Sequence, residues 1–121
     1  MSALLHILVV DDEPLAASVI GDFLARRGHR TTIAHSGQAA LQSHARDPAD
    51  LVITDIRMPG GDGHMLVANL RRVDARLPII VVTGQIELGT AGFDQDLPVL
   101  KKPVDLRKLM AMIDRMVARR G

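Results

Sequence analysis

The feature that most constrains the fold of this chain is a series of short apolar runs, each of which ends at a polar or charged residue. The three clearest runs cover residues 7–10, 51–54 and 79–82. A run that is apolar at almost every position is typical of a strand buried on both faces. Weaker strand candidates cover residues 30–34 and 97–100. These runs predict five strands, most of them in the interior of a sheet.

Helical patterns separate the predicted strands. The first begins at Pro14, which suits a first helical position, and stops near Gly28. The residues expected to face the core from this helix are Leu15, Val19, Phe23 and Leu24. Ser36 can cap a second helix that ends before Asp47. Two later helices are predicted from the apolar stripes formed by Leu66, Leu70 and Val73 and by Leu106, Leu109, Met110, Ile113, Met116 and Val117.

The alternation of strands and helices along the chain predicts an α/β fold. Continuous apolar strands favour a parallel sheet that is covered by helices on both faces. In such sheets, ligands bind at the carboxyl ends of the strands. The residues at or after these ends are Asp11, Asp12, Asp55, Thr83 and Lys102. We therefore expect three acids, one hydroxyl and one amine to meet at one edge of the sheet.

This set of side chains suits phosphoryl chemistry on an aspartate. Three neighbouring carboxylates repel one another and stay ionised only when a cation shares their site. Oxygen ligands favour a hard cation, with Mg²⁺ first and Mn²⁺ as an alternative. A carboxylate can accept a phosphoryl group as a nucleophile. A Lys ammonium and a Thr hydroxyl could then neutralise or bind the phosphoryl oxygens.

The composition excludes several other classes of function. The chain has no Cys, Trp or Tyr and only two Phe, which argues against thiol chemistry, disulfides and sites that stack flat ligands. The net charge of +1 is too balanced for a nucleic-acid domain. The five His have no ligand spacing, so we expect them to have surface or packing roles. Without a signal-peptide pattern or a membrane-length apolar run, we expect a cytoplasmic protein.

Four segments of the sequence resemble the signatures of the response-regulator receiver domain. They are residues 9–14, 55–63, 81–84 and 102–103. The resemblance extends from about His6 to about Val117 and implies a flavodoxin-like fold with a five-stranded parallel sheet in the order 2-1-3-4-5. On this basis, residues 1–121 are expected to form a single receiver domain.

The resemblance also implies roles for the residues of the acidic cluster. Asp55 matches the phosphoacceptor of the family. Asp11 and Asp12 match the acidic pair that holds Mg²⁺, with Asp12 expected to be the direct ligand. The backbone carbonyl of Arg57 matches the third protein ligand. Arg57 and Gln85 also match two variable positions that tune the lifetime of the phosphoryl group.

Other roles implied by the resemblance concern the response to phosphorylation. Thr83 matches the hydroxyl that moves to bind the phosphoryl group, and Lys102 matches the amine that pairs with it. The family usually has a cis peptide bond at the position of Lys102–Pro103. Lys101 would point to the opposite face of the strand. Val99 occupies the position where the family commonly has an aromatic switch residue, so this signal should be blunted or carried differently.

The expected function is to accept a phosphoryl group from a phosphohistidine of a histidine kinase or of a histidine phosphotransfer protein. Such a chain would be a phosphoacceptor and not a turnover enzyme, with a downstream protein as a further partner and no contact with nucleic acid or membrane. Met1 ahead of the first strand favours a stand-alone regulator. The alternative is a receiver module excised from a hybrid histidine kinase or from a longer response regulator.

One departure from the family concerns the segment between Thr83 and Lys102, which is a few residues shorter than usual. The glycines Gly84, Gly89 and Gly92 lie in it, so a fourth helix is expected to be short or irregular. In the family, this helix helps to form the surface through which many receivers dimerise. The shortening therefore argues against that dimer.

Two functions of other classes are possible for a chain with this pattern. A small Mg²⁺-dependent phosphatase of the haloacid-dehalogenase type also uses an Asp nucleophile, but it needs a second Asp two residues later. Glu13 occupies that position after Asp11, and no late acidic pair is present. A binding module of flavodoxin shape would not need the complete set of acids, Thr and Lys. Both readings are therefore less favoured than the receiver.

Overall fold

The chain folds around one parallel sheet with helices on both faces. The computed structural model describes residues 4–57, 63–84 and 97–120. Its strands are β1 (His6–Val10), β2 (Arg30–Ala34), β3 (Leu51–Asp55), β4 (Ile79–Thr83) and β5 (Val99–Lys101). Its helices are α1 (Pro14–Arg26), α2 (Gly37–Arg46), α3 (Gly63–Val73) and α5 (Leu106–Arg120). The strand order β2-β1-β3-β4-β5 confirms the predicted flavodoxin-like α/β fold.

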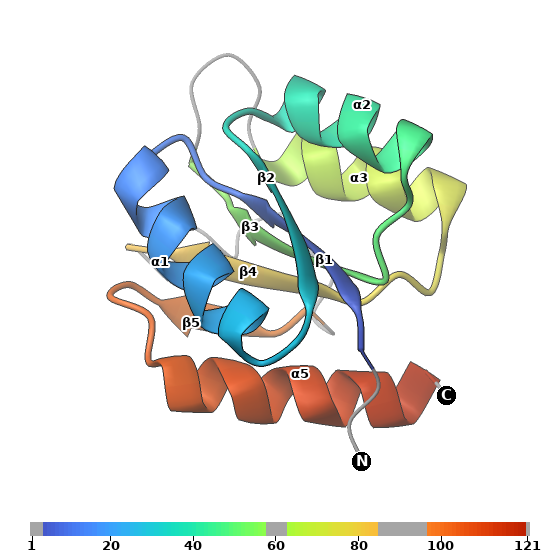
Figure 1. Ribbon diagram of the computed structural model, residues 1–121. Helices are drawn as coiled ribbons and strands as arrows, with labels where there is room; N and C mark the ends of the chain where they lie inside the picture. Colours follow the sequence, from blue (N-terminus) through green and yellow to red (C-terminus); the bar gives the residue numbers. More distant parts are fainter. Residues whose placement is uncertain (1–3, 58–62, 85–96, 121) are drawn as a thin grey trace.

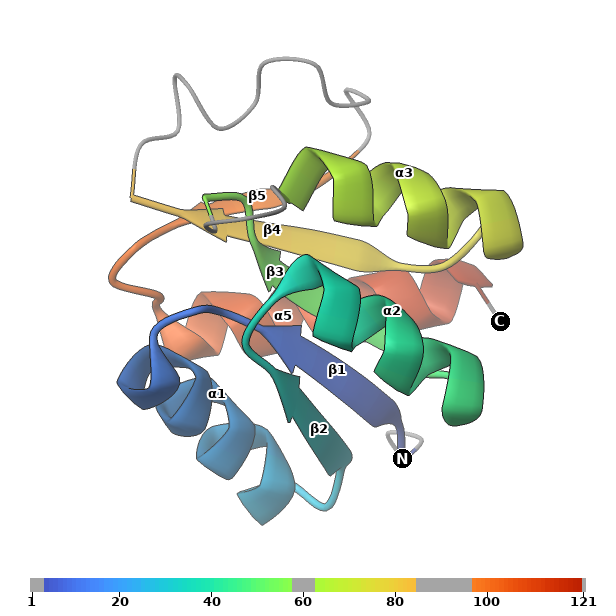
Figure 2. The ribbon, with the colours of Figure 1, turned by 90° about the horizontal axis from the view of Figure 1, so that it is seen from above.

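The sheet divides the core into two layers of buried side chains. α1 and α5 cover one face, and α2 and α3 cover the other (Figures 1 and 2). Leu8 and Val52 point into the layer beneath α2 and α3, whereas Ile7 and Ile53 point into the layer beneath α1 and α5. Every residue of β1, β3 and β4 is buried. This double burial is why these strands are apolar at successive positions.

The strand register brings the carboxyl ends of the strands to one edge of the sheet. Val10 of β1 lies beside Thr54 of β3. The next residues along the two strands, Asp11 and Asp55, are therefore neighbours at the end of the sheet. Thr83 of β4 pairs with Lys101 of β5, next to Lys102. All of these strands run parallel, so their ends point in the same direction and their polar residues share this edge.

The prediction for the buried face of α1 is wrong in two of its residues. Leu15 is 79% exposed and Val19 is 52% exposed. The residues that α1 buries are Ala17, Ile20, Gly21 and Leu24. A Cβ added at Gly21 would lie 3.1 Å from Cδ1 of Ile33 in β2. The helix lies close to the sheet at Gly21, and the positions that face the sheet are Ala17, Ile20, Gly21 and Leu24, while Leu15 and Val19 point away.

Two smaller predictions also differ from the structure. Leu66 and Leu70 of α3 are buried as predicted, but Val73 at its end is 77% exposed. The last strand begins at Val99 and not at Leu97. Pro98 has no N–H to donate to the sheet, and only its carbonyl takes part, by accepting the N–H of Val81. The expected fourth helix lies outside the described residues. No helix in the described part of the chain is long and apolar enough to cross a membrane.

One of the buried histidines near the amino-terminal edge of the sheet, His44, is expected to make the stability dependent on pH. Nδ1 of His44 accepts the N–H of Ala49 at 3.0 Å. Burial lowers the pKa of His44, the charge of Asp74 opposes this shift, and His6 adds to it. The neutral imidazole is thus favoured in the folded protein. Its contribution to stability is complete above the ordinary His pKa and is lost as the pH falls below it.

We expect the urea midpoint of unfolding to fall between pH 7.5 and pH 5, and to fall less in His44→Asn. The Asn side chain keeps an acceptor for the Ala49 N–H but has no proton to bind in this range. Chemical unfolding curves at both pH values measure the difference. Equal falls in the two proteins would contradict a role for His44.

Candidate functional site

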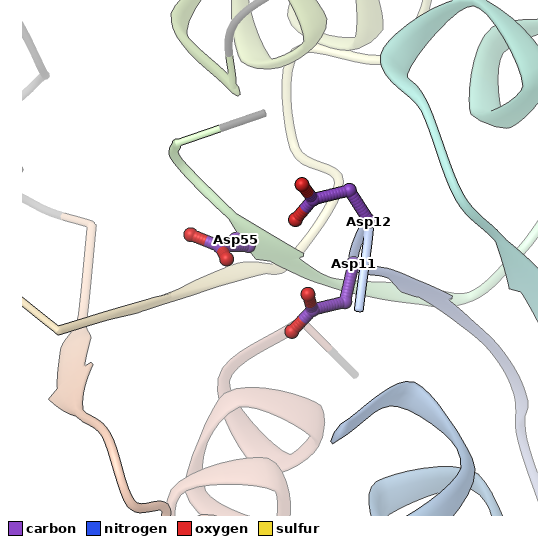
Figure 3. Close-up of side chains that lie close together, drawn as sticks. All are labelled: Asp11, Asp12 and Asp55. Carbon is purple, nitrogen blue, oxygen red and sulfur yellow. The ribbon is translucent and has the colours of Figure 1, made fainter. Parts of the chain in front are cut away.

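Three aspartates gather at the carboxyl ends of β1 and β3. Asp11 and Asp12 directly follow β1, and Asp55 is the last residue of β3. One carboxylate oxygen from each residue lies within 4.8 Å of the other two (Figure 3). Asp11 and Asp55 are buried, and Asp12 is half-buried. Because buried like charges at this distance repel, the site favours a cation among them.

Local hydrogen bonds shape the two loops that present the acids. Oδ1 of Asp11 accepts the N–H of Glu13 at 2.9 Å, and Oδ1 of Asp55 accepts the N–H of Arg57 at 3.0 Å. Each Asp thereby closes a turn two residues ahead of itself, which is a common use of this side chain. The turn at Asp11 leads directly to Pro14, where α1 begins. The Asp11 and Asp55 side chains therefore belong to the site and also stabilise the turns that follow β1 and β3.

Lys102 supplies the cation that the acids require in this structure. Its Nζ lies 2.8 Å from Oδ2 of Asp11 and 2.7 Å from Oδ2 of Asp55, while Glu13 lies farther away at 3.8 Å. Burial of the ammonium lowers the pKa of Lys102, but the hydrogen bonds to Asp11 and Asp55 outweigh it, so the pKa is raised above the ordinary Lys value. The ammonium is therefore charged and bridges the two buried acids.

The neighbours of Lys102 hold its backbone in place. Its N–H donates to the carbonyl of Thr83 at 2.8 Å, and the Lys102–Pro103 peptide bond is cis. Lys101 is exposed. The Thr83 side chain is fully buried at the end of β4. Val99 is half-buried and packs against the core layer of α2 and α3. Of the positions implied by the resemblance, Gln85 lies outside the described residues.

Two further residues contact the site, namely His35 and Gly63, of which Gly63 belongs to the signature segment 55–63. Nδ1 of His35, the residue directly after β2, lies 3.0 Å from the carbonyl oxygen of Asp11. Gly63, the first residue of α3, has its Cα so close to the end of β3 that an added Cβ would lie 2.7 Å from the Asp55 carbonyl oxygen. His35 directly follows β2, so its place in the sequence is equivalent to that of Asp11 after β1.

The donor set fits a hard divalent cation. All three side chains of the cluster offer carboxylate oxygens, and the structure gives the Asp12 carboxylate no hydrogen-bond partner within the described ranges. Mg²⁺ in proteins is held by one or two carboxylates and keeps further positions for water or phosphate oxygens. Asp12 is thus free to act as a ligand, while Asp11 and Asp55 also have Lys102 as a partner.

Comparison with known proteins identifies the family. The family model described as "Response regulator receiver domain" matches residues 7–114. The chain belongs to the response-regulator receiver family. The matched range begins in β1 and ends in α5, so this receiver domain includes all five strands and every residue of the site. The three aspartates lie at the strand ends where the apolar runs of the sequence placed them.

Relatives of this receiver domain include regulatory proteins of Escherichia coli K12 that are much longer. It is 37% identical to the transcriptional regulatory protein GlrR over 90% of this chain and 25% of that protein. It is 34% identical to the regulatory protein AtoC over 95% of this chain and 26% of that protein. The chain thus spans about a quarter of the length of these curated relatives.

A solved structure has the same fold over its whole length. It is that of a putative response regulator from Chloroflexus aurantiacus, with a TM-score of 0.87 and 30% identity. The match covers 96% of this chain and 99% of that one. The receiver fold seen in the five-stranded sheet is therefore shared with a protein of similar size.

Proposed function

We propose that this receiver domain accepts a phosphoryl group on Asp55 from a phosphohistidine of a histidine kinase or of a histidine phosphotransfer protein. The observation that supports this most is the bridge from Lys102 to Asp11 and Asp55, which places a charged ammonium against a buried carboxylate. An oxygen of Asp55 would bond to phosphorus while the phosphorus–nitrogen bond of the donor breaks. The electron pair of that bond returns to the donor imidazole.

The other residues of the site would bind the phosphoryl group and a metal ion. Lys102 can pair with phosphoryl oxygens, and Thr83 lies at the end of the neighbouring strand as a hydroxyl donor. Mg²⁺, or Mn²⁺ in its place, would be held by Asp11, Asp12, Asp55 and the backbone carbonyl of Arg57. The bound cation would neutralise charge on the phosphoryl oxygens during transfer. Together these groups stabilise the charge that develops in the transition state.

The proposal treats the chain as a cytoplasmic phosphoacceptor and not as a turnover enzyme. Membership of the receiver family supports it over the phosphatase and the flavodoxin-like binding module. We do not expect this chain to form the dimer that other receivers form through the fourth helix and α5. Action without an attached output domain stays a prediction, as does the blunted switch at Val99.

Treatment with acetyl phosphate and Mg²⁺ tests the proposal, because this small donor needs no kinase. Intact-mass measurement should show a gain of one phosphoryl group in the wild type and none in Asp55→Asn, since a neutral amide is a poor nucleophile. EDTA should abolish the gain. Asp22→Asn, a change on the exposed face of α1, is the matched control and should be phosphorylated normally.

Two results would overturn the assignment. One is a phosphoryl gain that persists in Asp55→Asn, which would place the acceptor elsewhere. The other is a wild-type protein that gains nothing from acetyl phosphate or from any phosphohistidine donor in the presence of Mg²⁺.

A further inference from the structure

The histidine after β2 is bonded to the backbone of the acidic pair. Nδ1 of His35 lies 3.0 Å from the carbonyl oxygen of Asp11. A carbonyl oxygen can only accept, so Nδ1 carries the proton and donates it. The N–H of Asp11 donates in turn to the carbonyl of Ala34 at 3.0 Å. Two successive residues at the end of β2 therefore bind both backbone polar groups of Asp11.

The hydrogen bond from His35 to the Asp11 carbonyl fixes the plane of the peptide unit that joins Asp11 to Asp12. The carbonyl of Asp11 and the N–H of Asp12 belong to the same rigid peptide unit. A hydrogen bond that holds the carbonyl therefore limits the directions open to the Asp12 side chain. Asp11 has further restraints, because its carboxylate is bound by Lys102 and by the N–H of Glu13.

Asp12 lacks such restraints on its own side chain. Within the ranges that the structure describes, its carboxylate has no hydrogen bond, yet it lies within 4.8 Å of the carboxylates of Asp11 and Asp55. Its direction depends on the backbone before it. Groups that orient metal ligands from outside the ligand set commonly affect metal affinity.

We propose that His35 is a positioning residue for the metal site, acting through the Asp11 carbonyl to hold Asp12 in its direction. This inference rests on the proposed function, since it concerns the same Mg²⁺ site. The donating Nδ1–H is the essential group, and His35 as a residue is exposed. A role confined to the stability of the fold would leave the metal affinity unchanged once the protein is folded.

Magnesium titration of the folded protein tests this role without any phosphoryl donor. Amide shifts in ¹H–¹⁵N NMR spectra report the binding of MgCl₂. We expect His35→Ala to weaken Mg²⁺ binding about two- to tenfold, the range that one hydrogen bond is worth. His35→Asn should restore most of the affinity, because its amide N–H can occupy the place of Nδ1–H. Gln38→Ala, an exposed change in α2, should bind Mg²⁺ as the wild type does.

A second spectrum reads the hydrogen bond itself. The ¹⁵N shifts of the His35 imidazole at pH 8 should show the tautomer with the proton on Nδ1, as the contact with Asp11 requires. The tautomer with the proton on Nε2 would overturn the proposal.

The outcomes separate this inference from the proposed function. If the wild type binds Mg²⁺ and His35→Ala binds it equally well, the positioning role is refuted while the metal site stands. If His35→Ala loses affinity but His35→Asn does not recover it, the Nδ1–H donor is not the essential group and the proposal fails. If the wild type does not bind Mg²⁺, the metal site and the role of His35 are both refuted.

Discussion

Replacing Lys102 by Met is expected to lower the free energy of unfolding by about 3 kcal/mol at neutral pH in EDTA, the typical cost of breaking a buried ion pair. The side chains of Asp11 and Asp55 are 1% and 8% exposed and would share the site without their bridging ammonium. The pKa of Lys102 is raised, so its contribution is complete below the ordinary Lys pKa and is lost only as the pH rises through the raised value. Urea unfolding curves measure the change.

Magnesium should recover much of the stability that Lys102→Met loses. A divalent cation held by the three aspartates would replace the missing ammonium, so millimolar MgCl₂ should raise the midpoint of the variant more than that of the wild type. Lys101→Met is the matched control, because this neighbour is exposed and should leave both values unchanged. A variant as stable as the wild type in EDTA would contradict the bridging role of Lys102.

Replacing Gly63 by Ala is expected to cost about 2 kcal/mol or more of unfolding free energy, as overpacking does in a tight core. The added Cβ would lie 2.5 Å from Cα of Ile56 and 2.7 Å from the carbonyl oxygen of Asp55. Both are backbone atoms, so no side chain can rotate away to make room. The N–H of Gly63 also donates to the carbonyl of Ile56 at 2.9 Å, which ties α3 to the same loop.

The displacement should also slow phosphorylation of Gly63→Ala by acetyl phosphate, because it would move Asp55, the proposed acceptor, and the loop with the Arg57 carbonyl. Gly84→Ala provides the control, since an added Cβ there meets no atom of the described residues within 4 Å. Unfolding curves and intact-mass time courses of both variants give the comparison. Normal stability and phosphorylation in Gly63→Ala would show that the loop can move aside without loss.

The elements and the acidic edge followed from local patterns. Runs such as Leu51–Ile53 are apolar on both faces, and this pattern needs no knowledge of the neighbours to indicate a central strand. The polar residues at the strand ends then meet because parallel strands end on the same side. Lys102 is preferred to Lys101 because it directly precedes Pro103, as the resemblance implies, and alternation along the strand then places Lys101 on the opposite face.

The buried face of α1 could not be predicted in the same way. The apolar pattern predicts that Leu15 and Val19 face the sheet. In the structure Ala17 and Gly21 face it, because α1 lies close to β2. That distance depends on the close contact between Gly21 and Ile33, which are far apart in the sequence. A periodic pattern shows which side chains are apolar, but it contains no information on the distance between the helix and the sheet.

By itself the sequence determined which strands form, in which direction they run and which side chains reach the acidic edge. Only the tertiary structure decided how those side chains are held. His35 reaches the carbonyl of Asp11 because β2 lies beside β1, and Gly63 touches the loop after Asp55 because α3 packs there. Burial and chain direction are local properties of a segment. Contacts of this kind depend on register and on the distance between elements, which exist only after the chain has folded.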